Sequence, residues 1–94
     1  MLKDVIEAHA AGGQMLWVRF QDGCEGTVDV ARMVEFREVF APLADPVVFA
    51  QVRVDSEIGT VVWPNGADLD PDVLHAEVTG EPIVFLSDRA TATR

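Results

Sequence analysis

Residues 15–30, with the sequence MLWVRFQDGCEGTVDV, carry the strongest fold signal in this chain of 94 residues. Apolar side chains occupy every second position from 15 to 20, which predicts a strand with one buried face. The residues on that face are Leu16, Val18 and Phe20. Asp22 and Gly23 both tolerate the positive φ angles of a tight hairpin turn, so the segment 24–30 is expected to return as an antiparallel strand.

Weaker strand patterns lie on both sides of this hairpin. Residues 5–10 are short, partly β-branched and closed by Gly12-Gly13, which predicts a strand and a tight turn before the hairpin. Three consecutive strands with short turns form an antiparallel meander. Residues 52–54 and 60–63 predict two more strands, so we expect one sheet of five strands.

An apolar stripe with helical spacing follows the hairpin. Its four members recur at i, i+3, i+7 and i+10, which predicts one helix through this stretch. They are Met33, Phe36, Phe40 and Leu43. Pro42 is expected to end regular helix near Phe40, because proline lacks an N–H and restricts the residue before it.

Two Asp-Pro pairs predict helix starts. Asp45-Pro46 and Asp70-Pro71 each place a capping carboxylate before a proline, whose missing N–H costs nothing in the first helical turn. Gly80 is expected to end the second of these helices, because glycine accepts the left-handed conformation found at many helix ends.

Length and composition fit one small α+β domain, since 49% of the residues are apolar and the chain is too short for two cores. We predict a single domain over residues 1–80, with a mostly antiparallel five-stranded sheet and two or three short helices on one face. A C-terminal extended segment is expected over 81–94. No run approaches 18 consecutive apolar residues, and the start MLKDVIEAHA lacks a signal-peptide core. We therefore expect a cytoplasmic protein without membrane contact.

The charge is strongly acidic and unevenly distributed. The chain has 16 acidic and 7 basic residues, a net charge of −9, which argues against general nucleic-acid binding. Residues 54–88 contain eight acidic residues and no Lys or Arg. Such a surface repels DNA and anionic lipid and attracts a basic protein. The alternative is that the acidic residues only keep a small domain soluble.

The segment WPNGADLDPDVL at residues 63–74 resembles a bacterial and archaeal family, domain of unknown function 2442. The residues that carry the resemblance are Trp63, Pro64, Asn65, Gly66, Asp68, Asp70 and Pro71. Weaker matches extend it over residues 3–76. The resemblance implies a small α+β domain and little about activity. It also implies that some members accompany a DNA-binding helix-turn-helix domain or lie beside a small putative toxin. Trp63 is expected to be structural, with its ring seated against a helix.

The acidic motif Asp68-x-Asp70-x-Asp72 has the first spacings of a calcium loop but not the rest. An EF-hand requires glycine and glutamate at later positions, where this chain has Val73 and Thr79. Helix capping explains the acidic residues without an ion. We therefore predict no metal site and no cofactor.

The reactive side chains lack the partners that catalysis needs. His75 lies one helical turn after Asp72, so the two side chains can pair, although exposed histidines explain both His75 and His9. The single cysteine, Cys24, excludes an internal disulfide and a Cys-x-x-Cys zinc pair, and the neighbouring Glu25 disfavours its thiolate. We predict no catalytic residues and no enzyme.

Two features suggest contact with another chain. Met15, Trp17 and Arg19 share the strand face opposite the buried one, and these residue types are enriched in interfaces. The tail contains an apolar run that can pair as an edge strand. Its residues are Ile83, Val84, Phe85 and Leu86.

We therefore predict a non-catalytic interaction or regulatory protein. The specific form is an antitoxin-like protein that neutralises a basic partner encoded nearby. The first alternative is a homo-oligomeric module assembled through the Met15, Trp17 and Arg19 face or through the tail. The second is a domain that binds a small ligand or a divalent metal, centred on Asp68, Asp72 and His75.

Overall fold

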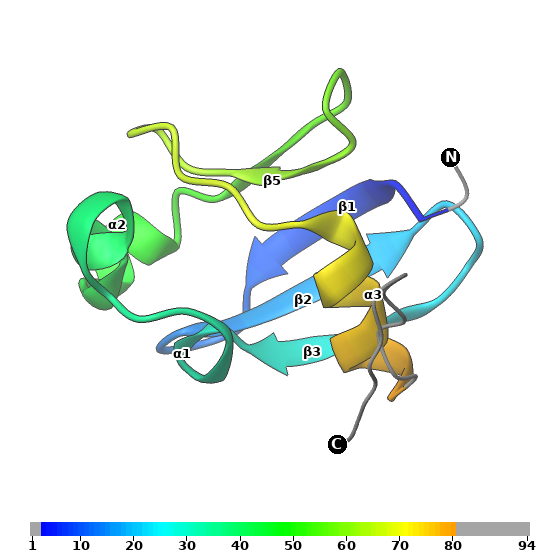
Figure 1. Cartoon of the computed structure of the whole chain (residues 1–94), viewed down its shortest axis with the longest axis horizontal. Coiled ribbons are helices and arrows are strands. Elements are labelled where there is room, and N and C mark those ends of the chain that lie inside the picture. Colours follow the sequence, from blue (N-terminus) through cyan, green and yellow to red (C-terminus); the bar gives the residue numbers. More distant parts are fainter. Residues whose placement is uncertain (1–2, 81–94) are drawn as a thin grey trace, which may run out of the picture.

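The predicted hairpin forms two strands of a three-stranded antiparallel meander, in the order β1-β2-β3 (Figure 1). The computed structural model describes residues 3–80. Strand β1 (Val5–Ala10) pairs with β2 (Met15–Phe20), which pairs with β3 (Glu25–Asp29). The predicted meander is confirmed. Strand β3 ends one residue early, because the Asp29 carboxylate accepts the Ala31 N–H and so caps a short helix.

The other two strands form a sheet of their own, so the prediction of a single five-stranded sheet is wrong. Strands β4 (Arg53–Asp55) and β5 (Thr60–Val62) pair with each other in a two-stranded sheet that lies next to β1 (Figure 1). The Val5 N–H donates to Gly59 O at 2.9 Å, at the turn between β4 and β5. The alternation of apolar and polar residues predicted these short strands. Strands of three residues, however, have a pattern too short to specify which strand they pair with.

The predicted helix through the apolar stripe is also wrong. The chain forms α1 (Val30–Met33), an irregular stretch and then the 3-10 helix η1 (Glu38–Ala44). Backbone conformation interrupts the helix twice, since Val34 is extended and Glu38 has a φ of +55°. Pro42 lies inside η1, where three-residue periodicity places Phe40 and Leu43 on the inner side.

Both Asp-Pro pairs begin helices as predicted. Asp45 caps α2 (Pro46–Phe49), and Asp70 caps α3 (Pro71–Thr79) by accepting the Asp72 N–H at 2.8 Å. Gly80 ends α3 in the left-handed conformation, with a φ of +77°. None of the helices within residues 3–80 is long and apolar enough to cross a membrane.

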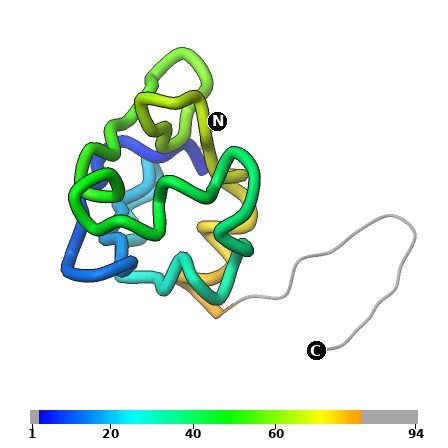
Figure 2. The backbone as a smooth tube through the Cα atoms, turned by 90° about the vertical axis from the view of Figure 1, so that its left-hand side faces the viewer, coloured from blue at the N-terminus to red at the C-terminus, as the bar shows by residue number. Residues whose placement is uncertain are grey.

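The core lies between the meander and the chain that folds over it (Figure 2). The three predicted side chains of β2, Leu16, Val18 and Phe20, are fully buried. Trp63 is 1% exposed, and its indole N–H donates to Phe49 O at 2.9 Å. Its ring centroid lies 5.5 Å from that of Phe49. The predicted structural role of Trp63 is therefore confirmed, because the ring attaches the end of β5 to α2.

Shortening Trp63 will test this attachment. We expect Trp63→Ala to lower the free energy of unfolding by about 3–5 kcal/mol, the usual cost of removing a large buried aromatic side chain. Trp63→Phe keeps a ring but leaves Phe49 O without its donor, which costs about 1–3 kcal/mol. Urea unfolding of Trp17→Phe, at a half-buried position, is the control. Equal stability of Trp63→Phe and wild type would contradict the role of the hydrogen bond.

Candidate functional site

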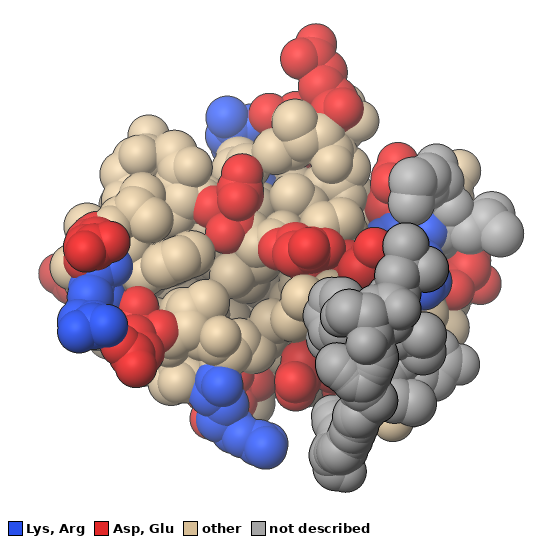
Figure 3. Space-filling model, viewed as in Figure 1, with Lys and Arg blue, Asp and Glu red and all other residues tan. Residues whose placement is uncertain are grey.

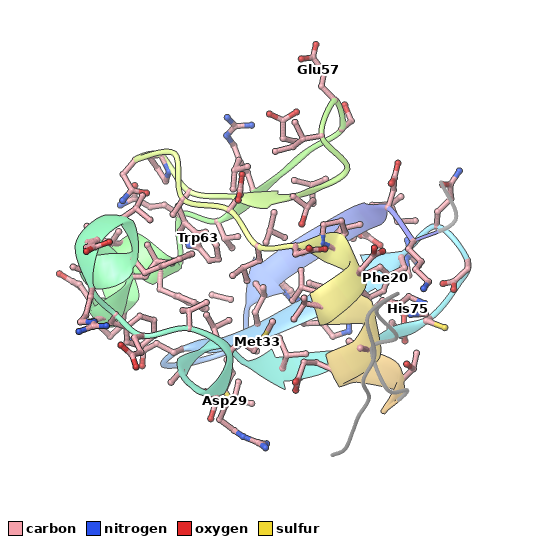
Figure 4. The ribbon with its side chains drawn as sticks, viewed as in Figure 1. Phe20, Asp29, Met33, Glu57, Trp63 and His75 are labelled. Atoms are coloured by element: carbon pink, nitrogen blue, oxygen red, sulfur yellow. The ribbon has the colours of Figure 1, made fainter. Side chains whose placement is uncertain are left out.

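Three described side chains that can bind a metal ion lie close together where the β2–β3 turn faces α3 (Figure 4). Asp22 and Cys24 come from the turn, and His75 comes from the middle of α3. The turn is tight, since the Gly23 N–H donates to Phe20 O at 2.9 Å. Gly23 has a φ of +93°, a conformation that glycine adopts without strain. The turn therefore places the side chains on either side of Gly23 close together.

Helix α3 lies close to this turn because β3 contains a glycine at the contact. A Cβ atom on Gly26 would lie 3.1 Å from Val78 Cγ1, tighter than ordinary packing. Val78 follows His75 by three residues, so the two side chains lie on neighbouring parts of the helix surface. The missing side chain at position 26 thus lets α3 approach until His75 reaches the turn.

His75 is buried and bonded to a residue 53 positions away in the sequence. Its Nε2 lies 2.8 Å from Asp22 Oδ2, and the residue is 5% exposed. Its ring meets Phe20 edge-on, with centroids 4.8 Å apart (Figure 4). The prediction of an exposed His75 is therefore wrong. The predicted pairing with Asp72 is also wrong, because among the described residues His75 makes its side-chain bond to Asp22.

Both carboxylate oxygens of Asp22 form hydrogen bonds. Oδ1 accepts the Cys24 backbone N–H at 3.0 Å, and Oδ2 faces His75. The Cys24 N–H is the largest cause of a lowered pKa for Asp22, followed by the hydrogen bond with His75. A further hydrogen bond from the Cys24 thiol acts in the same direction, and partial desolvation opposes it. Asp22 is therefore a carboxylate at neutral pH and accepts the His75 N–H.

The cluster contains three different kinds of metal-ligand atom, a carboxylate oxygen, a thiol sulfur and an imidazole nitrogen. One ligand atom each from Asp22, Cys24 and His75 lies within 4.8 Å of the other two. Here the Cys24 thiol and the His75 imidazole both bond to Asp22. The three donors therefore converge on one point, an arrangement that can bind a ligand.

The acidic part of the chain forms a second feature, the acidic surface. It consists of Asp55, Glu57, Asp68, Asp70, Asp72 and Glu77. Residues 54–80 contain no Lys or Arg, and none of these six carboxylates forms an ion pair with a cation of residues 3–80. Carboxylates gather near β5 and the start of α3, with most basic side chains toward the edge of the view (Figure 3).

The predicted interface residues of β2 lie on the outer face of the meander. Met15 is 36% exposed, and Trp17 is half-buried with its ring 4.9 Å from that of His9. Arg19 forms an ion pair with Glu7 on β1. The structure thus groups Met15, Trp17 and Arg19 on one face, as the strand pattern predicted. The tail run from Ile83 to Leu86 lies outside the described residues.

The 63–71 motif closes the fold over the core. Asn65 Nδ2 donates to Val39 O at 2.8 Å, and Asn65 Oδ1 accepts the Ala67 N–H at 3.2 Å. The Gly66 N–H donates to Trp63 O across the turn that contains Pro64. Asp68 forms a bridge with Val62. With the Asp70 cap at the start of α3, these contacts give the motif a structural role.

These features define a small α+β domain built on a three-stranded meander and closed by the 63–71 segment. The family model described as "Protein of unknown function (DUF2442)" matches residues 5–80, so the chain belongs to that family, as the sequence resemblance indicated. Comparisons with curated proteins and with solved structures gave no match.

Sequence reasoning located each residue of the Asp22, Cys24 and His75 cluster without bringing them together. The sequence indicates Asp22 only as a turn residue and Cys24 only as an unactivated thiol. One signal is available, because His75 lies beside Leu74 and Val78 on the apolar side of α3. A histidine at such a position must find a polar partner when the helix packs.

The pKa of Asp22 predicts acid sensitivity. Its pKa lies below its usual value of 3.8 in the folded protein. The stabilisation is therefore present in full above that value and is lost as the pH falls through the lower folded pKa. We expect urea unfolding to show a steeper loss of stability in acid for wild type than for Asp22→Asn. Glu77→Gln removes an exposed carboxylate from α3 as a charge control. Parallel pH profiles for wild type and Asp22→Asn would contradict the assignment.

Proposed function

We propose that this protein acts by binding a basic protein partner through the acidic surface, without catalysing a reaction. The observation that carries the proposal is the absence of Lys and Arg from residues 54–80, together with six carboxylates that form no ion pair with described cations. Unpaired surface carboxylates create a negative potential that speeds association with a positive surface.

The local geometry leaves these carboxylates available to a partner. Asp55 uses Oδ1 to accept the Glu57 N–H, and Asp70 uses Oδ1 to cap α3. Each of these turns holds its carboxylate in a fixed orientation, so less side-chain entropy is lost when a partner binds. Glu57, Asp68 and Glu77 are exposed, and Glu57 extends from the tip of the β4–β5 turn (Figure 4).

The specific form of the proposal is antitoxin-like neutralisation of a basic partner encoded nearby, in the bacterial or archaeal cytoplasm. The family resemblance supports it, since some members lie beside a small putative toxin. The charge balance supports it as well, because a net charge of −9 disfavours nucleic acid as the direct target.

Co-expression with the product of the adjacent gene tests the proposal. We expect the two proteins to co-purify, with an affinity that falls as salt is added. The triple variant Glu57→Lys, Asp68→Lys and Glu77→Lys should weaken binding by at least about tenfold, since like charges in an interface are strongly unfavourable.

A matched control separates the acidic surface from net charge. Glu7→Lys, Glu35→Lys and Glu38→Lys change the total charge equally, at exposed positions outside residues 54–80. This control should bind like wild type. A chain that elutes alone and leaves its neighbour's activity unchanged would overturn the proposal, as would equal loss in both triple variants.

The outer face of the meander supports a second candidate, self-association. Ile6 is 47% exposed on β1 and Met15 is 36% exposed on β2, with the half-buried Trp17 on the same strand face as Met15. Exposed apolar side chains combined with Trp and Arg are typical of interface cores. A second copy could bury these side chains face to face.

Sedimentation velocity over a range of concentrations tests this candidate. We expect wild type to form a dimer and the double variant Met15→Glu, Trp17→Glu to sediment as a monomer, because burying added charge disfavours the interface. Ile58→Glu changes another exposed apolar side chain, in the β4–β5 turn, and should leave the dimer intact. A monomeric wild type at every concentration would exclude the candidate.

A further inference from the structure

The β2–β3 turn and α3 bring together an oxygen, a sulfur and a nitrogen donor that the fold does not need in combination. From their arrangement we propose that Asp22, Cys24 and His75 bind one divalent transition-metal ion of the Zn²⁺ class. This site is separate from the acidic surface, and partner binding through that surface does not depend on it. The sequence alone predicted no metal site, since its candidate carboxylates were Asp68, Asp70 and Asp72.

The separations within the cluster are close to those of a metal site. The Asp22 and His75 ligand atoms are 2.8 Å apart, and Cys24 Sγ lies within 4.8 Å of each. Tetrahedral Zn²⁺ with bonds of about 2.0–2.3 Å requires ligand atoms about 3.3–3.6 Å apart. Binding would therefore move Asp22 Oδ2 and His75 Nε2 slightly apart and draw Cys24 Sγ inward. These are small rotations of side chains at a turn.

Burial gives the cluster an anchored side and an open side. The His75 side chain is 7% exposed, whereas that of Asp22 is 27% exposed and Cys24 is half-buried. The packing of His75 against Phe20 fixes the imidazole before an ion arrives. The turn residues face solvent, so an ion can enter from that side. An ordered ligand beside two accessible ones reduces the entropic cost of binding.

The donor types decide the class of ion. Mg²⁺ and Ca²⁺ prefer sites made of oxygen atoms, whereas thiolate and imidazole favour Zn²⁺ and its neighbours in the transition series. On binding, the Cys24 thiol releases its proton to solvent, and the Nε2 proton of His75 moves to Nδ1. Three protein ligands leave the fourth tetrahedral position to a water molecule.

A purely structural role for these residues predicts a different result. The hydrogen bond between Asp22 and His75 stabilises the contact between the turn and α3 without any sulfur. Cys24 packs against the edge of the core and hydrogen-bonds to Asp22, a structural role that a serine side chain also fills. The sulfur atom therefore distinguishes the two roles, because a Zn²⁺-class ion requires it and packing does not.

Titration of the full chain with Co²⁺, after chelator treatment and removal of the chelator, tests the site. Co²⁺ stands in for Zn²⁺ and gives a sulfur-to-cobalt charge-transfer band only when a thiolate binds it. We expect one equivalent of Co²⁺ to bind with this band and one equivalent of Zn²⁺ to abolish it. Cys24→Ser should remove the band, and His75→Gln should weaken binding by at least roughly tenfold to a hundredfold, the loss that even outer-shell changes cause.

Two controls keep the test decisive. His9→Gln changes the histidine on the outer face of the meander and should bind Co²⁺ like wild type. Circular dichroism shows which variants are folded, and Cys24→Ser decides the question if His75→Gln does not fold. Absence of a thiolate band in wild type would overturn the proposal. Equal Co²⁺ affinity in wild type and folded Cys24→Ser would overturn it as well.

Discussion

The structure depends on how α3 is held against the β2–β3 hairpin. His75 is buried between the Phe20 ring and the Asp22 carboxylate, and its polar edge would be costly to bury without that carboxylate. The contact between the hairpin and α3 thus depends on two glycines. Gly23 provides the positive φ of the turn, and Gly26 leaves room for Val78. That contact closes the core at the end of the meander opposite α2 (Figure 1).

The local elements of the fold could be predicted from sequence because each follows from short-range chemistry. Alternating apolar residues and the Asp22-Gly23 turn are enough to predict the hairpin. The Asp70 cap and Gly80 are enough to predict where α3 begins and ends. The failures arose where tertiary packing decides. The three-residue step from Phe40 to Leu43 is compatible with an α-helix or with a 3-10 turn, and only the packed chain selects between them.

The candidate site illustrates the same limit over a longer range. Asp22 and His75 are 53 residues apart, and no local pattern pairs a turn carboxylate with a helix histidine. The nearer residue, Asp72, has a suitable helical spacing, but it lies at the exposed start of α3. Burial of His75 on the apolar side of the helix determined its partner. A polar side chain on an apolar helix face is therefore the sequence feature from which such a contact can be inferred.

The two proposed activities use different parts of the domain. The acidic surface follows the chain from β4 through α3, whereas Asp22, Cys24 and His75 meet on the buried side of α3, at the hairpin turn. Both depend on α3 being docked in the observed position, since this helix carries Asp72 and Glu77 as well as His75. The stability of its docking is thus a common condition for partner recognition and for ion binding.

A double-mutant cycle on Asp22 and His75 tests this docking most directly. The free energies of unfolding of wild type, Asp22→Asn, His75→Gln and the double variant, measured with urea near neutral pH, give the coupling between the two side chains. We predict a favourable coupling well outside experimental error, with the second substitution costing much less once the first is made. Strictly additive effects would show that the two side chains do not hold α3 on the hairpin.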